Sequence, residues 1–274
     1  MEQFIQLKHR SVYIPFILVL FLMFFQQFSG INAAIFFSAT IFKQAHVTLQ
    51  PTLVTFLAVG IVQVVATVVS VLVVDWRGRK QLLVVSSIGM CGSSALLGAY
   101  FYILDDWCGG CFGNTTITTS HCPPNSNASS YHGEHDFCNN SGLGTIAIVG
   151  VIIFIVAFSL AWGPIPWTSM SELVPGRVRS LYASIASMVN WSFAVIITAC
   201  FQPYSDLVTP KFAWWSFSIV MFVSIFFVVI FLPEAKGHSL EQIEDHFENG
   251  KIVAITCKCS LCKKQPGGGR EDSH

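Results

Sequence analysis

The stretch IPFILVLFLMFFQQFSGINAAIFF, residues 14–37, decides the fold. Its apolar run is long enough to cross the hydrocarbon core of a bilayer, which takes about 20 residues of helix. Three amide side chains interrupt the run: Gln26, Gln27 and Asn32. Amides inside a span are costly, and they usually face the interior of a helix bundle or a water-filled cavity. The stretch therefore predicts a membrane helix with a polar inner side.

The composition of the whole chain points to a membrane protein. Of its 274 residues, 53% are hydrophobic and 11% are charged, whereas soluble domains carry about 25% charged residues. The net charge is zero, so no basic excess suggests binding to nucleic acid. We expect an all-α protein, because lipid cannot satisfy the hydrogen bonds of an open backbone.

Six segments have the length and apolar character of membrane-spanning helices: residues 12–36, 53–74, 82–104, 144–171, 181–201 and 213–232. An even number of spans places both termini on one side. Lysine and arginine concentrate in the segments of that side, such as DWRGRK at 75–80 and PGRVR at 175–179, and this bias predicts that both termini are cytosolic. We expect a multi-pass protein of the plasma membrane or of an endomembrane such as the lysosomal membrane. Its predicted parts are a cytosolic segment 1–11, a six-span unit 12–232 and a cytosolic tail 233–274 whose end is disordered.

The loop between the third and fourth expected spans, residues 105–143, is predicted to lie outside the cell or in a lumen. It contains three glycan acceptor sequences, at Asn114, Asn127 and Asn139. It also contains four cysteines that are candidates for disulfide bonds, in any of three pairings: Cys108, Cys111, Cys122 and Cys138. An oxidising compartment favours disulfides. The alternative is a zinc site formed by Cys108, Cys111 and nearby histidines, but we expect neither metal nor cofactor.

Three further cysteines, Cys257, Cys259 and Cys262, lie among lysines in the predicted tail. A C-x-C-x-x-C run can bind a metal, and cysteines next to a membrane can be acylated. Reduced thiols in a disordered tail are the third interpretation, and the sequence leaves all three open.

Two of the expected spans contain residues that break helices. Gly30 follows the first two amides and can adopt dihedral angles that unwind the chain. Gly163, Pro164 and Pro166 lie together in GPIPW, where each proline lacks a backbone N–H. Transporters use such breaks at mid-membrane depth to present polar groups to a substrate. The alternative is that the amides join neighbouring helices.

The polar residues of the spans suit a neutral, hydroxyl-rich solute. Two more amides, Gln63 and Asn190, lie in other spans, and Trp167 and Trp191 add two indoles. An amide both donates and accepts hydrogen bonds, as a hydroxyl does, and an indole offers a flat apolar face to a sugar ring. The spans hold no mid-depth acid or histidine of the kind that an ion pathway needs. We find no catalytic constellation and expect no enzyme.

Five motifs in order resemble the sugar porter family of the major facilitator superfamily: QQFSGIN, DWRGRK, GPIPW, E-x-x-P-x-x-x-R (Glu172, Pro175, Arg179) and PEAKG at 233–237. Within that family, residues 7–248 are similar to the facilitative glucose transporters of animals, and most to their trehalose-transporter-like branch. The match covers spans seven to twelve of a twelve-span fold. It therefore implies the six-helix C-terminal half of a transporter that carries a neutral hexose or disaccharide by alternating access.

The resemblance also implies roles for particular residues. The implied sugar contacts are Gln26, Gln27, Asn32, Gln63, Trp167 and Asn190. The implied salt bridges that latch the cytosolic side involve Asp75, Arg79, Glu172, Arg179 and Glu234. The chain departs from the family's pattern in three places: Gln63 replaces an asparagine, AFSLAW lacks a glutamate that many members have, and Trp76 replaces an arginine.

Half a transporter has half a site, and we weigh three explanations for it. The chain is expected to be a fragment of a longer carrier, or a short isoform that pairs with a second copy or a full-length partner. The alternative is a non-transporting six-span protein that acts as a regulator, sugar receptor or partner subunit. The expected partners are the lipid bilayer, a neutral sugar and the missing half or a second transporter chain. Because lipid would not suit the amide-bearing face, we also predict rapid turnover or retention unless something covers it.

Overall fold

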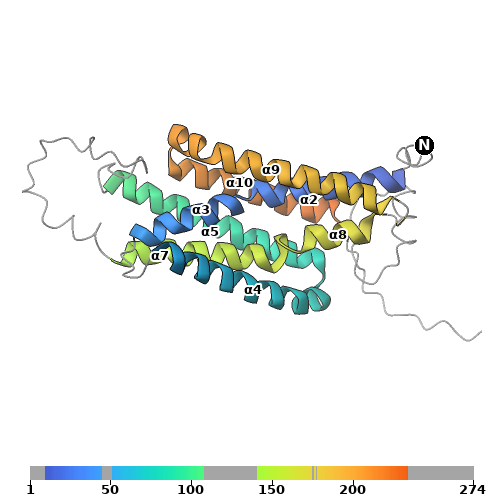
Figure 1. Ribbon diagram of the computed structural model, residues 1–274, viewed down its shortest axis with the longest axis horizontal. Coiled ribbons are helices and arrows are strands. Elements are labelled where there is room, and N and C mark those ends of the chain that lie inside the picture. Colours follow the sequence, from blue (N-terminus) through green and yellow to red (C-terminus); the bar gives the residue numbers. More distant parts are fainter. Residues whose placement is uncertain (1–9, 45–50, 108–140, 175, 177, 234–274) are drawn as a thin grey trace, which may run out of the picture.

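The computed structural model describes residues 10–44, 51–107, 141–174, 176 and 178–233 (Figure 1). Helices make up almost all of this part of the chain, which contains no strand. The helices are α2 (Arg10–Phe28), α3 (Ile31–Gln44), α4 (Pro51–Arg77), α5 (Arg79–Trp107), α7 (Ser141–Ala157), the π-helical turn η1 (Phe158–Trp162), α8 (Ile165–Leu173), α9 (Arg179–Val208) and α10 (Pro210–Phe231). The all-α prediction is confirmed.

Five stretches of the described chain are long and apolar enough to cross a membrane: Val12–Phe36, Arg79–Ile103, Ile146–Leu173, Arg179–Val208 and Pro210–Phe231. The other expected span, 53–74, lies within α4, whose 27 residues include the shorter apolar stretch Val59–Val74. The first and fourth expected spans each consist of more than one helix, because each is interrupted partway.

The helices run side by side along the long axis of the bundle (Figure 1). The start of α2, the turn between α4 and α5, and the end of α8 lie at one end, and the turn between α9 and α10 lies at the other. Helix α5 packs along α10 and α7, while α2 packs along α9. Segments that are far apart in sequence therefore meet around the two interrupted spans.

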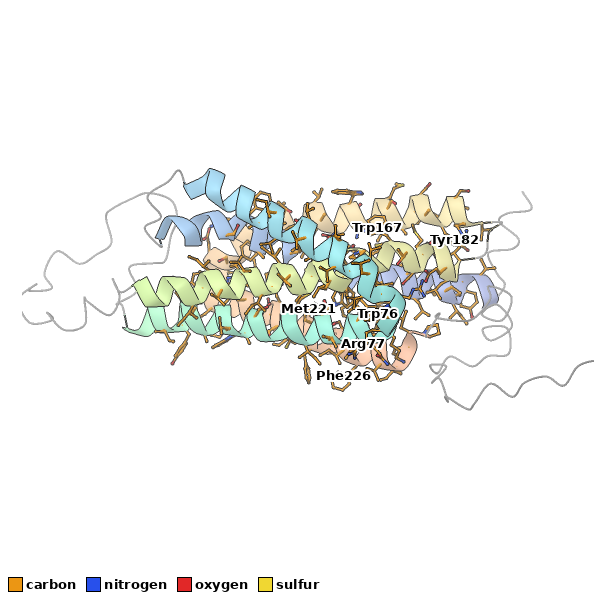
Figure 2. All side chains as sticks on the ribbon, turned by 90° about the horizontal axis from the view of Figure 1, so that it is seen from below. Trp76, Arg77, Trp167, Tyr182, Met221 and Phe226 are labelled. Atoms are coloured by element: carbon orange, nitrogen blue, oxygen red, sulfur yellow. The ribbon has the colours of Figure 1, made fainter. Side chains whose placement is uncertain are left out.

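The turn between α4 and α5 is made by DWRGRK. Gly78 has a φ of +84°, a conformation that glycine adopts without a steric penalty, and its N–H donates to the Val74 carbonyl at 3.0 Å. Figure 2 shows Trp76 and Arg77 at this end of the bundle. Trp76 is exposed.

Large side chains that are fully buried fix the helices around η1. They include Met23, Leu83, Phe154, Trp162 and Trp214, which come from five different elements. Figure 2 shows the contrast along α10, where Met221 points into the bundle and Phe226 points out of it. Close packing of this kind leaves little freedom for the elements that carry the site.

Helix α9 is longer than the sequence predicts. The apolar pattern gives a span over 181–201, whereas the helix continues to Val208 and contains Pro203. Phe201 and Ser205 are buried one turn apart and keep this last part of the helix against the bundle. Packing thus offsets the hydrogen bond that the proline removes.

Candidate functional site

The first span is interrupted between α2 and α3, where the sequence predicts a break. Gly30 has a φ of +86°, and its N–H donates to the Gln27 carbonyl at 3.3 Å rather than continuing the helix. The Phe217 ring lies so close that a Cβ at residue 30 would come within 2.5–2.8 Å of three of its carbon atoms. The break turns the chain so that the Asn32 Nδ2 donates to the Gln27 Oε1 at 3.0 Å.

The fourth span is interrupted between α7 and α8. Helix α7 passes into η1, where the Gly163 N–H donates to the Phe158 carbonyl at 2.8 Å. Helix α8 begins just after Pro164 and has Pro166 in its first turn. Because prolines cannot donate, carbonyl groups of this segment are left to accept hydrogen bonds from other helices.

The amides of three different segments converge between these two breaks. Asn190 on α9 donates to the Gln26 Oε1 at 2.7 Å and accepts from the Gln27 Nε2 at 3.0 Å. Gln26 in turn donates to the backbone oxygens of Trp162 at 2.8 Å and Gly163 at 3.1 Å. The Asn32 bond to Gln27 completes what we call the amide network: Gln26, Gln27, Asn32 and Asn190.

Most of the amide network is removed from solvent. Gln26, Gln27 and Asn190 are 4%, 8% and 2% exposed, and Asn32 is half-buried. The side-chain hydrogen bonds of the three buried amides all go to other amides, to backbone carbonyls or to the Met23 sulfur. Buried polar groups need such partners. The network therefore joins helices, as one of the two sequence interpretations holds, and it also gathers uncharged polar side chains at one place between the two breaks.

The remaining candidate sugar contacts, Gln63 and Trp167, make no hydrogen bond to this network within the described part of the chain. Trp167 is half-buried on the first turn of α8 and packs against the core. Gln63 is half-buried on α4. Trp191 is 67% exposed although it follows the buried Asn190 directly. The two members of the Asn190-Trp191 pair thus point in different directions.

Sequence reasoning missed Trp162, which directly precedes GPIPW. Its side chain is fully buried, and its indole N–H donates to the Ser87 Oγ at 2.8 Å. The Ser224 hydroxyl also contacts the Ser87 Oγ, at 3.2 Å. Trp162 therefore connects the amide network, through its own carbonyl, to α5 and α10. The only signal in the sequence was an indole next to a helix break.

The charged residues at the α4–α5 end form one ion pair within the described part of the chain. Arg79 at the start of α5 pairs with Glu172 near the end of α8 at 2.5 Å, and both side chains are about a quarter exposed, at 23% and 28%. Arg179 donates instead to the Val174 backbone oxygen at 3.4 Å. The side chain of Asp75 and all of Glu234 lie outside the described residues.

The predicted lumenal features also lie outside the described residues. These are the acceptor residues Asn114, Asn127 and Asn139 and the disulfide candidates Cys108, Cys111, Cys122 and Cys138, together with the cysteines of the tail. The two cysteines that the structure does describe, Cys91 and Cys200, are free thiols. Glycosylation and disulfide pairing stay predictions.

Comparison with known proteins identifies the kind of chain to which these features belong. The sequence pattern of the family described as Sugar (and other) transporter matches residues 1–247. The facilitated trehalose transporter Tret1-2 homolog of Drosophila sechellia is 38% identical over 230 residues, which are 84% of this chain and 41% of that protein. The facilitated trehalose transporter Tret1 of Drosophila pseudoobscura pseudoobscura is 36% identical over 243 residues, or 89% of this chain and 24% of that protein. The chain thus spans less than half the length of these relatives.

Solved structures show the same relation at the level of the fold. The inward-open xylose transporter XylE from E. coli matches with a TM-score of 0.60 and 22% identity, over 85% of this chain and 42% of that one. The proton:xylose symporter XylE bound to 6-bromo-6-deoxy-D-glucose matches with a TM-score of 0.65 and the same identity and coverage. The described helices therefore have the fold of part of a major facilitator superfamily transporter.

Proposed function

This chain belongs to the sugar transporter family, a family of carriers and not of enzymes, and on this premise we propose that it supplies one half of the site of a facilitative carrier for a neutral sugar. The other half would come from a second helical bundle, and the sugar would pass between the two by alternating access. The amide network is the observation that carries this proposal.

The chemistry of the network matches a sugar better than an ion. Its members are uncharged, and each can both donate and accept a hydrogen bond. A sugar hydroxyl has the same capacity, so it can replace an amide-to-amide bond without leaving a buried group unpaired. The half-buried Trp167 offers an apolar ring face to the C–H groups of a sugar. Disaccharide or hexose is the class that the names of the relatives suggest: two are named for trehalose, and one neighbour holds a glucose derivative.

The exposed surface of α9 supports a second bundle as partner. Few residues of α9 are buried, and the exposed ones mix apolar with polar side chains, among them Met188, Trp191, Ser192 and Gln202. The exposed residues of α10 from Ile219 onward are all apolar, as a lipid-facing surface requires. Polar side chains on a membrane helix usually face protein or water. We propose that another bundle covers α9 and that lipid covers α10.

The charge distribution supports the proposed orientation. Arg77, Arg79, Lys80 and Arg179 lie at the end of the bundle where α4 turns into α5 and α9 begins, while Lys211 lies at the opposite end. The basic end would face the cytosol under the positive-inside rule. Both the N-terminal end of α2 and the C-terminal end of α10 would then be cytosolic, in the plasma membrane or an endomembrane.

A second candidate function is a six-span regulator, receptor or partner subunit without transport activity. The observation that favours it is that the side chains of the amide network hydrogen-bond to one another, so that they need no substrate as a partner. Such a protein would bind sugar or a transporter chain but would move nothing across the membrane.

Uptake by proteoliposomes separates these two functions. We would fuse this chain behind the N-terminal bundle of the Drosophila sechellia relative and measure the entry of radiolabelled trehalose and D-glucose, with L-glucose as the measure of leak. We expect saturable uptake of at least one of the two sugars, and a loss of about tenfold in Gln27→Leu and Trp167→Leu.

The matched control is Gln81→Leu, which removes an exposed amide from α5, outside both the amide network and the α9 surface proposed to meet the second bundle. Uptake in this variant should equal that of the unmodified fusion. If both Gln27→Leu and Trp167→Leu take up sugar as well as the unmodified fusion does, these two residues are not part of a sugar site. Sugar binding without any uptake would favour the second function.

A further inference from the structure

The break between α7 and α8 separates two backbone carbonyls from their usual partners. In a continuous α-helix, the oxygens of Leu160 and Trp162 would accept the N–H groups of residues 164 and 166. Both of these residues are prolines and have no N–H to give. A buried carbonyl needs a donor from elsewhere, because leaving it unpaired is costly.

Side chains of two other helices take over these carbonyls. Ser70 on α4 donates its hydroxyl to the Leu160 oxygen at 2.6 Å, and Gln26 on α2 donates to the Trp162 oxygen at 2.8 Å. Ser70 is 1% exposed. Thr67, one turn earlier on α4, bonds only within its own helix, to the Gln63 oxygen at 2.8 Å. Ser70 therefore ties α4 directly to the break.

The bend at this break sets the direction of α8. The helix has nine residues, with Trp167 near its start and Glu172 near its end, where the ion pair with Arg79 holds it. A helix of nine residues responds to a change of this bend as one rigid unit. Any change in the angle near Leu160 would therefore displace Trp167 relative to the amide network.

We infer that Ser70 is a positioning residue for the candidate site: its hydroxyl replaces the backbone donor that Pro164 lacks and so fixes the direction of α8. It acts through the Leu160 carbonyl and need not touch the sugar. Its importance for sugar recognition rests on the proposed function, because that function makes Trp167 a sugar contact. The claim that Ser70 fixes the direction of α8 depends only on the hydrogen bond from Ser70 to the Leu160 oxygen.

The bend can be measured directly on the full chain in lipid nanodiscs without sugar. Spin-label amino acids at Ile153 on α7 and Ser171 on α8, both exposed, report the distance across the break by pulsed electron paramagnetic resonance. We expect Ser70→Ala to broaden and shift the distance distribution. The control Thr67→Val, which removes a hydroxyl from the same helix, should leave the distribution as it is in the unmodified chain.

A second variant restores the missing donor by another route. Pro164→Ala gives residue 164 an N–H, and we expect this N–H to bond to the Leu160 oxygen, so that the Ser70 hydroxyl becomes dispensable. Adding Ser70→Ala to Pro164→Ala should therefore not change the distribution further. This comparison remains decisive if Ser70→Ala alone does not fold. A Ser70→Ala distribution like that of the unmodified chain, equal broadening by Thr67→Val, or a further change in the double variant would overturn the inference.

Uptake by the fusion carrier tests the functional part separately. Ser70→Ala should raise the sugar concentration for half-maximal uptake by about tenfold, whereas Thr67→Val should not. If the unmodified fusion takes up no sugar but the bend depends on Ser70, the proposed function alone is wrong. If the fusion takes up sugar and the bend is independent of Ser70, the inference alone is wrong.

Discussion

Gly30 shows how a single residue interrupts the first span and brings its amides together. Its φ of +86° belongs to the left-handed region, which costs residues with a Cβ about 1–2 kcal/mol. The same residue lies against the Phe217 ring, so its missing side chain also lets α10 approach. Because the chain turns here, Asn32 reaches Gln27 from the far side of the break.

Gly30→Ala should lower the free energy of unfolding by about 2–4 kcal/mol, through the strained φ and the overpacking against Phe217. Thermal unfolding of the purified chain in mild detergent measures this change. The control is Gly92→Ala on α5, where an added Cβ meets nothing within 4 Å. The control should be neutral or slightly stabilising, since alanine favours helix. A loss no larger than that of the control would mean that Gly30 does not hold the break.

Asn190 illustrates a different residue-scale effect. It connects the two glutamines that precede the break, and its amide nitrogen also lies 3.3 Å from the Met23 sulfur. An asparagine on a mostly apolar helix is detectable in the sequence. Its partners are not, because they lie more than 160 positions away.

At the scale of elements, helix α8 is held by polar contacts near both of its ends. The break holds its start, and the ion pair between Arg79 and Glu172 holds its end against α5. Partly exposed pairs of this kind contribute only about 0–1 kcal/mol, because water screens them. Because the ion pair is weak, it could break and form again at little cost during a conformational cycle.

Glu172→Gln should loosen α8 with little effect on overall stability. We expect faster hydrogen exchange of the α8 amides, while the free energy of unfolding changes by about 1 kcal/mol or less. The charge swap Arg79→Glu with Glu172→Arg should slow exchange again relative to either single substitution. Exchange that does not respond to the single variants would show that the pair does not hold α8.

At the scale of the whole molecule, the bundle has two kinds of exposed surface. The exposed side of α10 is apolar from Ile219 onward, whereas α9 exposes polar residues among its apolar ones. A bilayer suits the first surface, and another protein suits the second. The predicted rapid turnover of the uncovered chain belongs to this scale, because it depends on a surface and not on any single contact.

Thiol cross-linking in native membranes can show which surface is covered. In a chain whose nine cysteines are replaced by serine, Met188→Cys on α9 should form a disulfide bond with the protein that covers α9 under mild oxidation. Ile219→Cys on α10, with nearly equal exposure at 64% against 71%, should do so much less. Equal cross-linking at both positions would mean that α9 has no dedicated partner. If the chain also survives longer in cells that contain the cross-linked partner, this would support the proposal that a partner covers α9.

The sequence by itself determined the apolar helical stretches, the places where two of them break and the family. Each of these depends mainly on local chemistry: lipid demands apolar helices about 20 residues long, and glycine or proline beside polar residues favours a break in a helix, although α9 continues past Pro203. Residues 26–32 and 163–167 therefore contained enough information to predict both interruptions. The motifs that resemble sugar porters are likewise short and contiguous.

Only the tertiary structure decided which polar groups meet. Ser70 with Leu160, Trp162 with Ser87, and Asn190 with Gln26 are 75 to 164 positions apart. Each pairing depends on how the helices rotate and cross, which is set by the packing of many apolar side chains at once. Hydrogen bonds act over about 3 Å, so no local pattern in a chain can state which distant partner comes within reach.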